Sequence, residues 1–128
     1  MDIRQITFRD IPPEIVADGK ISRLIFRDGP GVLYFGGYLD GRLVTLACLV
    51  VHKNGNATIK SNYTLKGHRG RGHFTELLGH VLGHARALGV KTISLNCLKD
   101  SVGIHAKAGA RLWKTTKTIY WLVYDEGF

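Results

Sequence analysis

The sequence has no long hydrophobic run, little cysteine and few acidic residues for its length. Its longest apolar stretch, Leu43 to Val51 with Thr45 inside it, is far too short to span a bilayer. The first residues also lack the apolar segment of a secretory signal peptide. We therefore expect a cytoplasmic protein, of a cell or of an infected host, with no membrane partner.

The two cysteines, Cys48 and Cys97, each lie inside an apolar, strand-like segment. This placement favours reduced, buried thiols over a disulfide framework, and no zinc-finger spacing exists. Glu76, His80 and His84 recur at helical spacing and could share a helix face with His73. The span from Glu76 to His84 alone is ~12 Å along the helix, too far for one ion. We therefore predict no metal site.

The length and composition are those of an ordinary globular protein. The chain has 128 residues, of which 45% are hydrophobic and 22% are charged. Domains cluster at roughly 100 to 150 residues, so a second core would need more chain than is available. We expect one domain over residues 1–128.

Positive charge is concentrated in the second half of the chain. The net charge is +8, and residues 57–128 carry eleven basic and four acidic side chains. Such a field attracts nucleic acid, an acidic membrane surface or a polyphosphate small molecule. Composition alone does not choose among these three partners.

Hydrophobic periodicity and turn signals predict the element order β α β β β α β α β β. The expected strands cover residues 2–8, 32–39, 42–53, 57–65, 91–98, 111–114 and 118–125, and the expected helices cover 11–25, 74–88 and 101–108. Hairpin signals at residues 40–41 and 54–55 make the middle strands antiparallel. The right-handed crossover rule makes the strand at 91–98 parallel to the one at 57–65. The predicted class is α/β (α+β), with a mixed, mostly antiparallel sheet of six to seven strands.

Alternation in the strand at 57–65 predicts that Ile59 and Tyr63 share one side and that Lys60 and Asn62 share the other. In the long helix that follows, an apolar stripe runs from Phe74 to Leu88. Two glycines inside this helix, at positions 79 and 83, lower its stability and suggest close packing on a strand or a ligand.

A glycine-rich loop, Lys66 to His73, lies between this strand and this helix. Glycines let a backbone approach an anion, and the free amides and the dipole of a helix start favour negative charge. Arg69 and Arg71 add full charges, although a simple helix cap with surface arginines has the same pattern. The Gly-Lys-Ser/Thr of a P-loop is absent, and the loop does not open a dinucleotide-binding βαβ unit.

Residues 63–78, Tyr-Thr-Leu-Lys-Gly-His-Arg-Gly-Arg-Gly-His-Phe-Thr-Glu-Leu-Leu, resemble the acyl-CoA loop of the GNAT superfamily of N-acyltransferases. The family motif is Gln/Arg-x-x-Gly-x-Gly/Ala, and residues 69–74 match its first and fourth positions. Phe74 departs from it at the sixth. Residues 85–91 and 104–110 resemble two further family segments, so the motifs cover about residues 57–112. The resemblance implies a single GNAT-like domain with a splayed parallel strand pair.

The resemblance also implies a cofactor site for acetyl-CoA as co-substrate. The backbone of residues 63–65 would hold the thioester end, and the amides of residues 69–74 would hold the pyrophosphate. The family often has an asparagine before the short helix, where this sequence has Leu98, and Asp100 or Ser101 would take part of its role. The implied cofactor-binding residues are Tyr63, Thr64, Leu65, Arg69, Gly70, Arg71, Gly72, His73, Phe74 and Ser101.

The catalytic positions depart most from the family. Lys60 stands where many members have a glutamate base, and a lysine is a poor base at neutral pH. His105 stands where a tyrosine acid is common, and its ordinary pKa of about 6.5 permits it to act as acid or as base. We predict His105 as the catalytic residue, with packing at the helix surface or against CoA as the alternative. Asn62 either contacts the acceptor substrate or faces solvent.

The predicted function is N-acetyl transfer from acetyl-CoA to a small-molecule or macromolecular amine, by direct attack in a ternary complex of a monomer or homodimer. The alternatives are an acyltransferase acting on nucleic acid or a modified base, a basic nucleic-acid-binding module without catalysis, and a protein that binds CoA without turnover. The aromatic residues of the last two strands would pack in the core or at an edge. A base-stacking surface beside Lys114 and Lys117 is the alternative for these aromatics.

Overall fold

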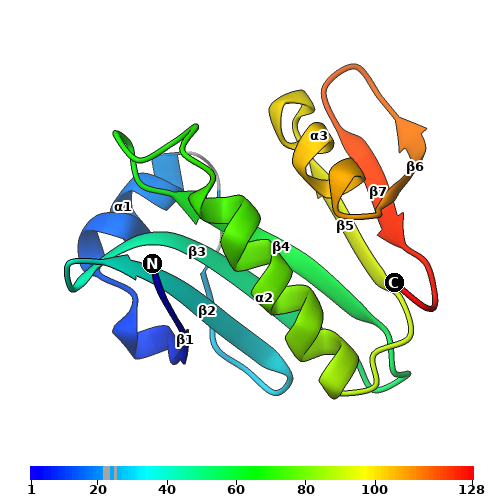
Figure 1. Cartoon of the computed structure of the whole chain (residues 1–128), viewed down its shortest axis with the longest axis horizontal. Coiled ribbons are helices and arrows are strands. Elements are labelled where there is room, and N and C mark those ends of the chain that lie inside the picture. Colours follow the sequence, from blue (N-terminus) through cyan, green and yellow to red (C-terminus); the bar gives the residue numbers. More distant parts are fainter. Residues whose placement is uncertain (22–23, 25) are drawn as a thin grey trace.

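The described residues form one seven-stranded sheet and three α-helices (Figure 1). The computed structural model describes residues 1–21, 24 and 26–128. The strands are β1 (Asp2–Ile6), β2 (Val32–Leu39), β3 (Arg42–Val51), β4 (Ala57–Thr64), β5 (Ile93–Cys97), β6 (Arg111–Thr115) and β7 (Tyr120–Tyr124). The helices are η1 (Phe8–Asp10, a 3-10 turn), α1 (Pro13–Ile21), α2 (His73–Ala87) and α3 (Lys99–Lys107). Apart from the short η1, this is the order that the sequence predicts.

The strand order in the sheet is β1-β2-β3-β4-β5-β7-β6. Every neighbouring pair is antiparallel except β4 and β5, which are parallel. These two strands pair only at Ala57 with Ile93 and at Thr58 with Ser94, and then they diverge (Figure 1). The predicted mixed sheet and its splayed parallel pair are both confirmed.

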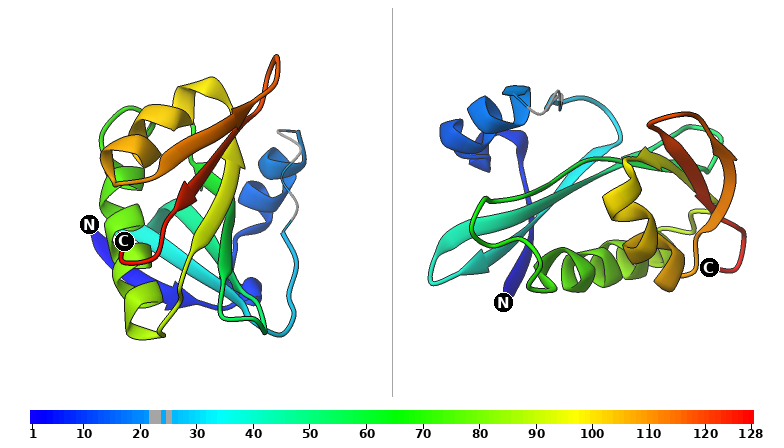
Figure 2. Two further views of the ribbon diagram at one scale, coloured as in Figure 1. Left: turned by 90° about the vertical axis from the view of Figure 1, so that its right-hand side faces the viewer. Right: turned by 90° about the horizontal axis from the view of Figure 1, so that it is seen from above.

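Helices cover the two faces of the sheet unevenly (Figure 2). On one face, α2 packs on β2, β3 and β4, and α3 packs on β5 and β7. On the other face, α1 covers a second, smaller apolar cluster that includes Ile15, Leu46 and Tyr63. The predicted stripe of α2 is buried in the larger cluster at Leu77, Leu78, Val81, Leu82 and Ala85. None of the helices in the described part of the chain has both the length and the apolar character needed to cross a membrane.

Helix α1 is shorter than its sequence pattern predicts. It ends at Ile21, and the amide of Leu24 donates a hydrogen bond of 2.8 Å to the carbonyl of Gly19. A bond from residue i to residue i−5 closes a wider turn than an α-helix has, so the regular helix stops there. Ile25, which the prediction included, lies outside the described residues.

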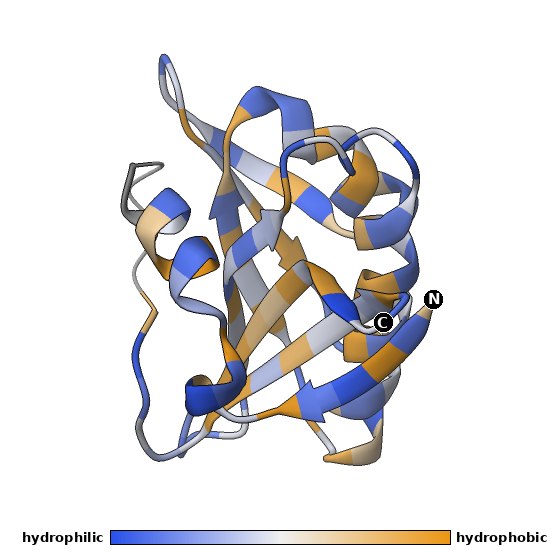
Figure 3. Cartoon of the chain, turned by 90° about the vertical axis from the view of Figure 1, so that its left-hand side faces the viewer, coloured by the Kyte–Doolittle hydropathy of each residue, from blue (hydrophilic) through white to orange (hydrophobic). Residues whose placement is uncertain are grey.

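The outer strand β1, whose hydropathy colouring Figure 3 shows, does not alternate strictly. Asp2 and Arg4 are exposed and form an ion pair at 2.7 Å, and Gln5 next to Arg4 is also exposed. The partly buried Ile3 packs against the core cluster under α2, whereas Ile6 packs against the cluster under α1. Because these two isoleucines are three positions apart, they lie on opposite faces of the strand, and β1 contributes to both clusters.

The alternation predicted for β4 is wrong beyond Ser61. The register against β3 shifts there, so that two residues of β4 oppose Ala47, and Ser61 takes a φ of +54°. Such a bulge moves every later side chain to the opposite face. Ile59 therefore lies in the cluster under α2, and Tyr63 lies in the cluster under α1.

Close packing does not explain the glycines inside α2. A Cβ added at Gly79 would meet no atom within 4 Å, and one at Gly83 would meet only a guanidinium nitrogen of Arg86 at 4.0 Å. Gly79 is exposed on the outer side of the helix. The prediction that these residues permit a close approach to a strand is therefore wrong.

Candidate functional site

The glycine-rich loop leaves β4 and leads into the first turn of α2, beside the gap between β4 and β5 (Figure 1). Gly70 and Gly72 have φ angles of +74° and +81°, a left-handed conformation that side chains disfavour. A Cβ built at either position would meet no atom within 4 Å. The backbone conformation, not crowding, therefore requires glycine here, and the outer surface of the loop is open.

The amides at the start of α2 have no side-chain cap. Gly72 is the N-cap residue, and its carbonyl accepts a hydrogen bond of 3.1 Å from the amide of Glu76. The amides of the first turn and the positive end of the helix dipole therefore remain available to an anion. Arg71, on the exposed loop, makes no hydrogen bond or ion pair with any described residue. This helix start has the features of a phosphate site.

Arg69 points back to the strand instead. Its Nε donates a hydrogen bond of 2.8 Å to the carbonyl of Thr64, and its guanidinium lies 5.6 Å from the ring centroid of Tyr63. These contacts fasten the loop to the end of β4. Of the two loop arginines, Arg71 is the one without a partner among the described residues.

The segment predicted to hold a thioester is tied mainly to β3. The Oγ1 of Thr45 donates a hydrogen bond of 3.2 Å to the carbonyl of Tyr63, and the amide of Leu65 donates one of 2.8 Å to the carbonyl of Val44. The carbonyl of Thr64 accepts the Nε–H of Arg69, and its second lone pair can accept a further hydrogen bond. The segment is thus rigidly placed at the edge of the gap.

The hydroxyl of Tyr63 donates a hydrogen bond to the carboxylate of Asp18, which lies on α1. Tyr63 is 5% exposed and Asp18 is half-buried. The sequence does not single out Asp18, because one acid in a short helix has no distinguishing pattern. The structure brings it to the strand that borders the gap.

Lys60 and Asn62 flank the bulge of β4. Lys60 pairs in register with the buried Cys48, whose pKa is raised to about 11 by its burial despite the lysine charge nearby. The Oδ1 of Asn62 is buried and has no hydrogen-bond partner among the described residues. A buried amide oxygen without a partner costs free energy, which a bound donor would recover.

His105, on α3, is fully buried. Its Nδ1 lies 2.8 Å from the hydroxyl oxygen of Tyr124, and its Nε2 is buried without a partner among the described residues. The rings of His105 and Phe74 meet edge to face, with centroids 6.1 Å apart. Burial lowers the pKa of His105 to about 4, so the imidazole is neutral at neutral pH.

Phe74, which stands where the family motif has glycine or alanine, turns toward the core and does not obstruct the loop. Phe74 is half-buried and packs against the core cluster under α2, beside His105. The structure therefore joins two of the predicted residues, one from the loop and one from α3. Ser101 lies half-buried in the first turn of α3. Tyr124, which the sequence predicts to pack in the core or at an edge, is fully buried and is also the hydrogen-bond partner of His105.

Cys97 ends β5 close to this region and is half-buried. Burial raises the pKa of its thiol, which disfavours the nucleophilic thiolate. The part of the chain that the structure describes holds no cluster of three or more potential metal ligands.

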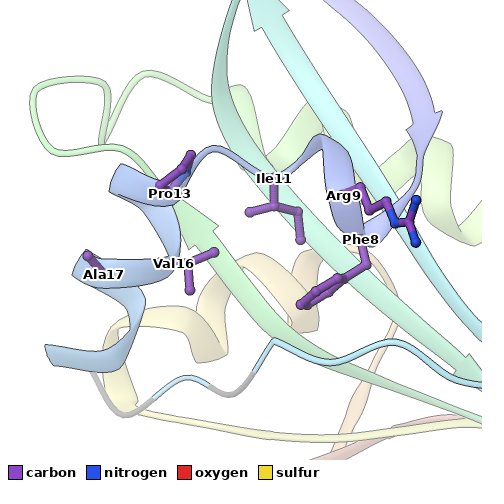
Figure 4. A pocket seen from close by; sticks show the side chains of 6 residues that line it. All are labelled: Phe8, Arg9, Ile11, Pro13, Val16 and Ala17. Atoms are coloured by element: carbon purple, nitrogen blue, oxygen red, sulfur yellow. The ribbon is translucent and has the colours of Figure 1, made fainter.

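Two hollows lie away from the loop. The larger, of about 490 Å³, surrounds the turn between η1 and α1 (Figure 4) and is lined by Phe8, Arg9, Ile11, Pro13, Val16 and Ala17. The smaller, of about 260 Å³, lies where β5 ends and is lined by Leu98, Lys99, Asp100, Lys117, Thr118 and Tyr120. Neither contains a residue of the glycine-rich loop.

A model of the acetyltransferase (GNAT) family matches residues 2–110. No curated protein matches the sequence. The fold is similar to that of the IAA acetyltransferase from Bacillus cereus, at 14% identity and a TM-score of 0.77 over 98% of each chain. It is also similar to the ribosomal-protein-alanine N-acetyltransferase from Brucella melitensis, at 15% identity and a TM-score of 0.78, covering 96% of this chain and 98% of that one. A third similar structure is an N-acetyltransferase from Staphylococcus aureus, at 16% identity and a TM-score of 0.74, covering 97% and 96%.

Proposed function

The chain belongs to the GNAT family of acetyltransferases, and on that premise we propose that it transfers an acetyl group from acetyl-CoA to an amine by direct attack in a ternary complex. The observation that carries this proposal is the divergence of β4 and β5 beside an uncapped helix start. The gap would take the thioester arm, and the helix start would take the phosphates. The catalytic unit would comprise residues 1–128, as a cytoplasmic monomer or homodimer.

The loop residues support a site for acetyl-CoA. The amides of Gly72, His73 and Phe74 would hold the pyrophosphate, with the side chain of Arg71 adding charge. Gly70 would let the loop turn, and Arg69 would hold the loop on β4. The backbone of residues 63–65 and the hydroxyl of Ser101 would position the thioester arm. When bound, acetyl-CoA supplies the activated acetyl group.

The amine must lose a proton before it attacks, and the departing thiolate must gain one. We propose His105 as the group that handles one of these protons through Nε2. If Nδ1 carries the hydrogen and donates to Tyr124, Nε2 can accept a proton. If the Tyr124 hydroxyl donates to Nδ1, Nε2 carries a hydrogen that it can donate. The contact of 2.8 Å permits both arrangements.

The low pKa of His105 indicates which of its protonation states are available for proton transfer. An imidazole with a pKa of about 4 is neutral near pH 7, which makes an imidazolium acid rare and supports the neutral forms. Lys60 remains a poor candidate for the base. Asp18, whose carboxylate accepts a hydrogen bond from the hydroxyl of Tyr63, is another candidate for accepting the proton of the amine. Asn62 would contact the acceptor through its unpartnered Oδ1.

Thermal unfolding with acetyl-CoA tests the cofactor site. Binding to the folded state alone should raise the melting midpoint in proportion to the logarithm of ligand concentration. A midpoint that does not move at millimolar acetyl-CoA would contradict the proposal. Release of CoA thiol, followed with a panel of amines, then tests turnover. Intersecting double-reciprocal plots would support the ternary complex, and parallel plots would contradict direct attack.

A further inference from the structure

One face of the sheet is open beyond the splayed strands. Leu95, Leu122 and Tyr124 of β5 and β7 point into the core cluster under α2 and α3. Alternation places the intervening residues of these strands on the opposite face. Helix α1 lies over the far end of that face, as Figure 2 shows, and none of the described helices covers β5, β7 and β6 there.

A row of three side chains crosses this open face. Asn96 of β5 pairs in register with Trp121 of β7, which pairs with Lys114 of β6. The ammonium of Lys114 lies 4.8 Å from the ring centroid of Trp121. Trp113, at the bulge next to Lys114, is 56% exposed. Both tryptophans of the chain therefore belong to the hairpin of β6 and β7.

The charge around this row is strongly positive. Residues 99–117 contain five basic side chains and one acidic side chain. Arg111 is neutralised by two contacts with Asp125, at 2.9 and 3.0 Å. Lys99, Lys114 and Lys117 form no ion pair within the described residues. Lys99 and Lys117 line the smaller hollow at the end of β5.

We propose that the open face of β5, β7 and β6 binds single-stranded nucleic acid. Bases would stack on Trp121 and Trp113, and phosphates would meet Lys114, Lys117 and Lys99. Lysines beside the half-buried Trp121 and the exposed Trp113 suit a chain that alternates charge with flat, apolar rings. The long side chain of Lys114 lets its ammonium move to a phosphate while a base takes its place over the indole.

Two comparisons favour this partner. The proposed CoA phosphate site uses Arg71 and the start of α2, so the lysines of the hairpin are not needed there. An acidic peptide would satisfy the lysines but would leave the two indoles without stacking partners. Binding to this surface can be measured without acetyl-CoA, so its test does not depend on the proposed acetyl transfer.

Tryptophan fluorescence gives a direct test, because both tryptophans lie on this hairpin. We expect single-stranded oligothymidylate of about 12 nucleotides to quench the emission, with an affinity that falls steeply with salt. The double variant K114Q/K117Q should bind about tenfold more weakly and lower the salt slope by about two. The variant K53Q/K91Q, which changes two exposed lysines elsewhere, should bind like the original chain.

Several results would overturn the proposal. They are the absence of quenching at low salt, an equal loss in both double variants, and equal quenching by oligoglutamate. Tighter binding of duplex DNA would exclude base stacking as the source of affinity. A dimer in sedimentation that W113A abolishes, without any nucleic acid present, would assign the face to a second copy of the chain. Loss of acetyl-CoA binding or turnover has no bearing on these outcomes.

Discussion

The Nδ1 of His105 lies 2.8 Å from the hydroxyl oxygen of Tyr124, and both side chains are fully buried. The contact joins α3 to β7 across the core. Burial lowers the pKa of His105 to about 4 and raises that of Tyr124, so both groups are neutral when the protein is folded. A neutral, buried pair of this kind makes stability depend on pH and limits what His105 can do chemically.

The first prediction concerns stability in mild acid. Unfolded His105 has a pKa near 6.5, above its folded value of about 4, so the unfolded state binds the extra proton between these pH values. Stability from this residue is therefore full above about pH 6.5 and falls as the pH drops to about 4, by up to about 3 kcal/mol. The variant H105N retains an amide near Tyr124 but does not titrate. Its stability, measured by urea unfolding, should therefore lack the decrease with falling pH that comes from His105. Equal pH profiles for both proteins would contradict the prediction.

The second prediction concerns turnover. H105N should lower kcat by roughly 100-fold, the lower range of general acid–base contributions. The shift in melting midpoint caused by acetyl-CoA should be nearly unchanged, because the phosphates bind elsewhere. Y124F removes the partner of Nδ1 and should lower kcat less, as a positioning residue does. If H105N keeps the original rate across pH 6 to 9, His105 has no part in the reaction.

The third prediction concerns the anion site. R71E should weaken acetyl-CoA binding by about tenfold or more, because it replaces an attractive charge with a repulsive one near the phosphates. R42E makes the same charge change at the exposed first residue of β3, and it should leave the affinity nearly unchanged. Isothermal titration with acetyl-CoA measures both. Equal losses would mean that the general field of the protein, and not a local site, attracts the ligand.

The fourth prediction compares alanine substitutions at two glycines, one at the start of α2 and one inside it. G72A should destabilise the protein by about 1 kcal/mol, because alanine is strained at a φ of +81° although its Cβ has room. G79A should stabilise it by up to about 1 kcal/mol, because this helix-interior site also has room and alanine favours helix. Chemical unfolding at one pH gives both values. A destabilised G79A would show that the helix needs this glycine for a reason that its surroundings do not reveal.

Most of the fold follows from local sequence patterns. The stripe from Leu77 to Ala85 predicts α2, and the turn signals near Gly41 and Gly55 predict the central antiparallel strands. The loop motif predicts where an anion would bind, because glycines and a following helix are local features. The family resemblance in the sequence is confirmed by the match over residues 2–110.

Two features differ from what the local patterns predict. The bulge at Ser61 moved Tyr63 to the face of α1, since the register between strands, not the sequence of one strand, decides which face a side chain takes. Helix α1 stopped at Ile21, where the predicted pattern continued.

The protonation of His105 shows most clearly which properties the sequence determines and which the tertiary structure determines. By itself, the sequence determined the order of elements, the position of the loop and the residue at position 105. Periodicity, turn signals and motifs depend only on residues that are close together in the chain. Only the tertiary structure decided that this histidine is buried beside Tyr124 and Phe74. A pKa depends on solvent and neighbours in three dimensions, so the same residue that the sequence offers as an acid or a base is neutral in the folded protein.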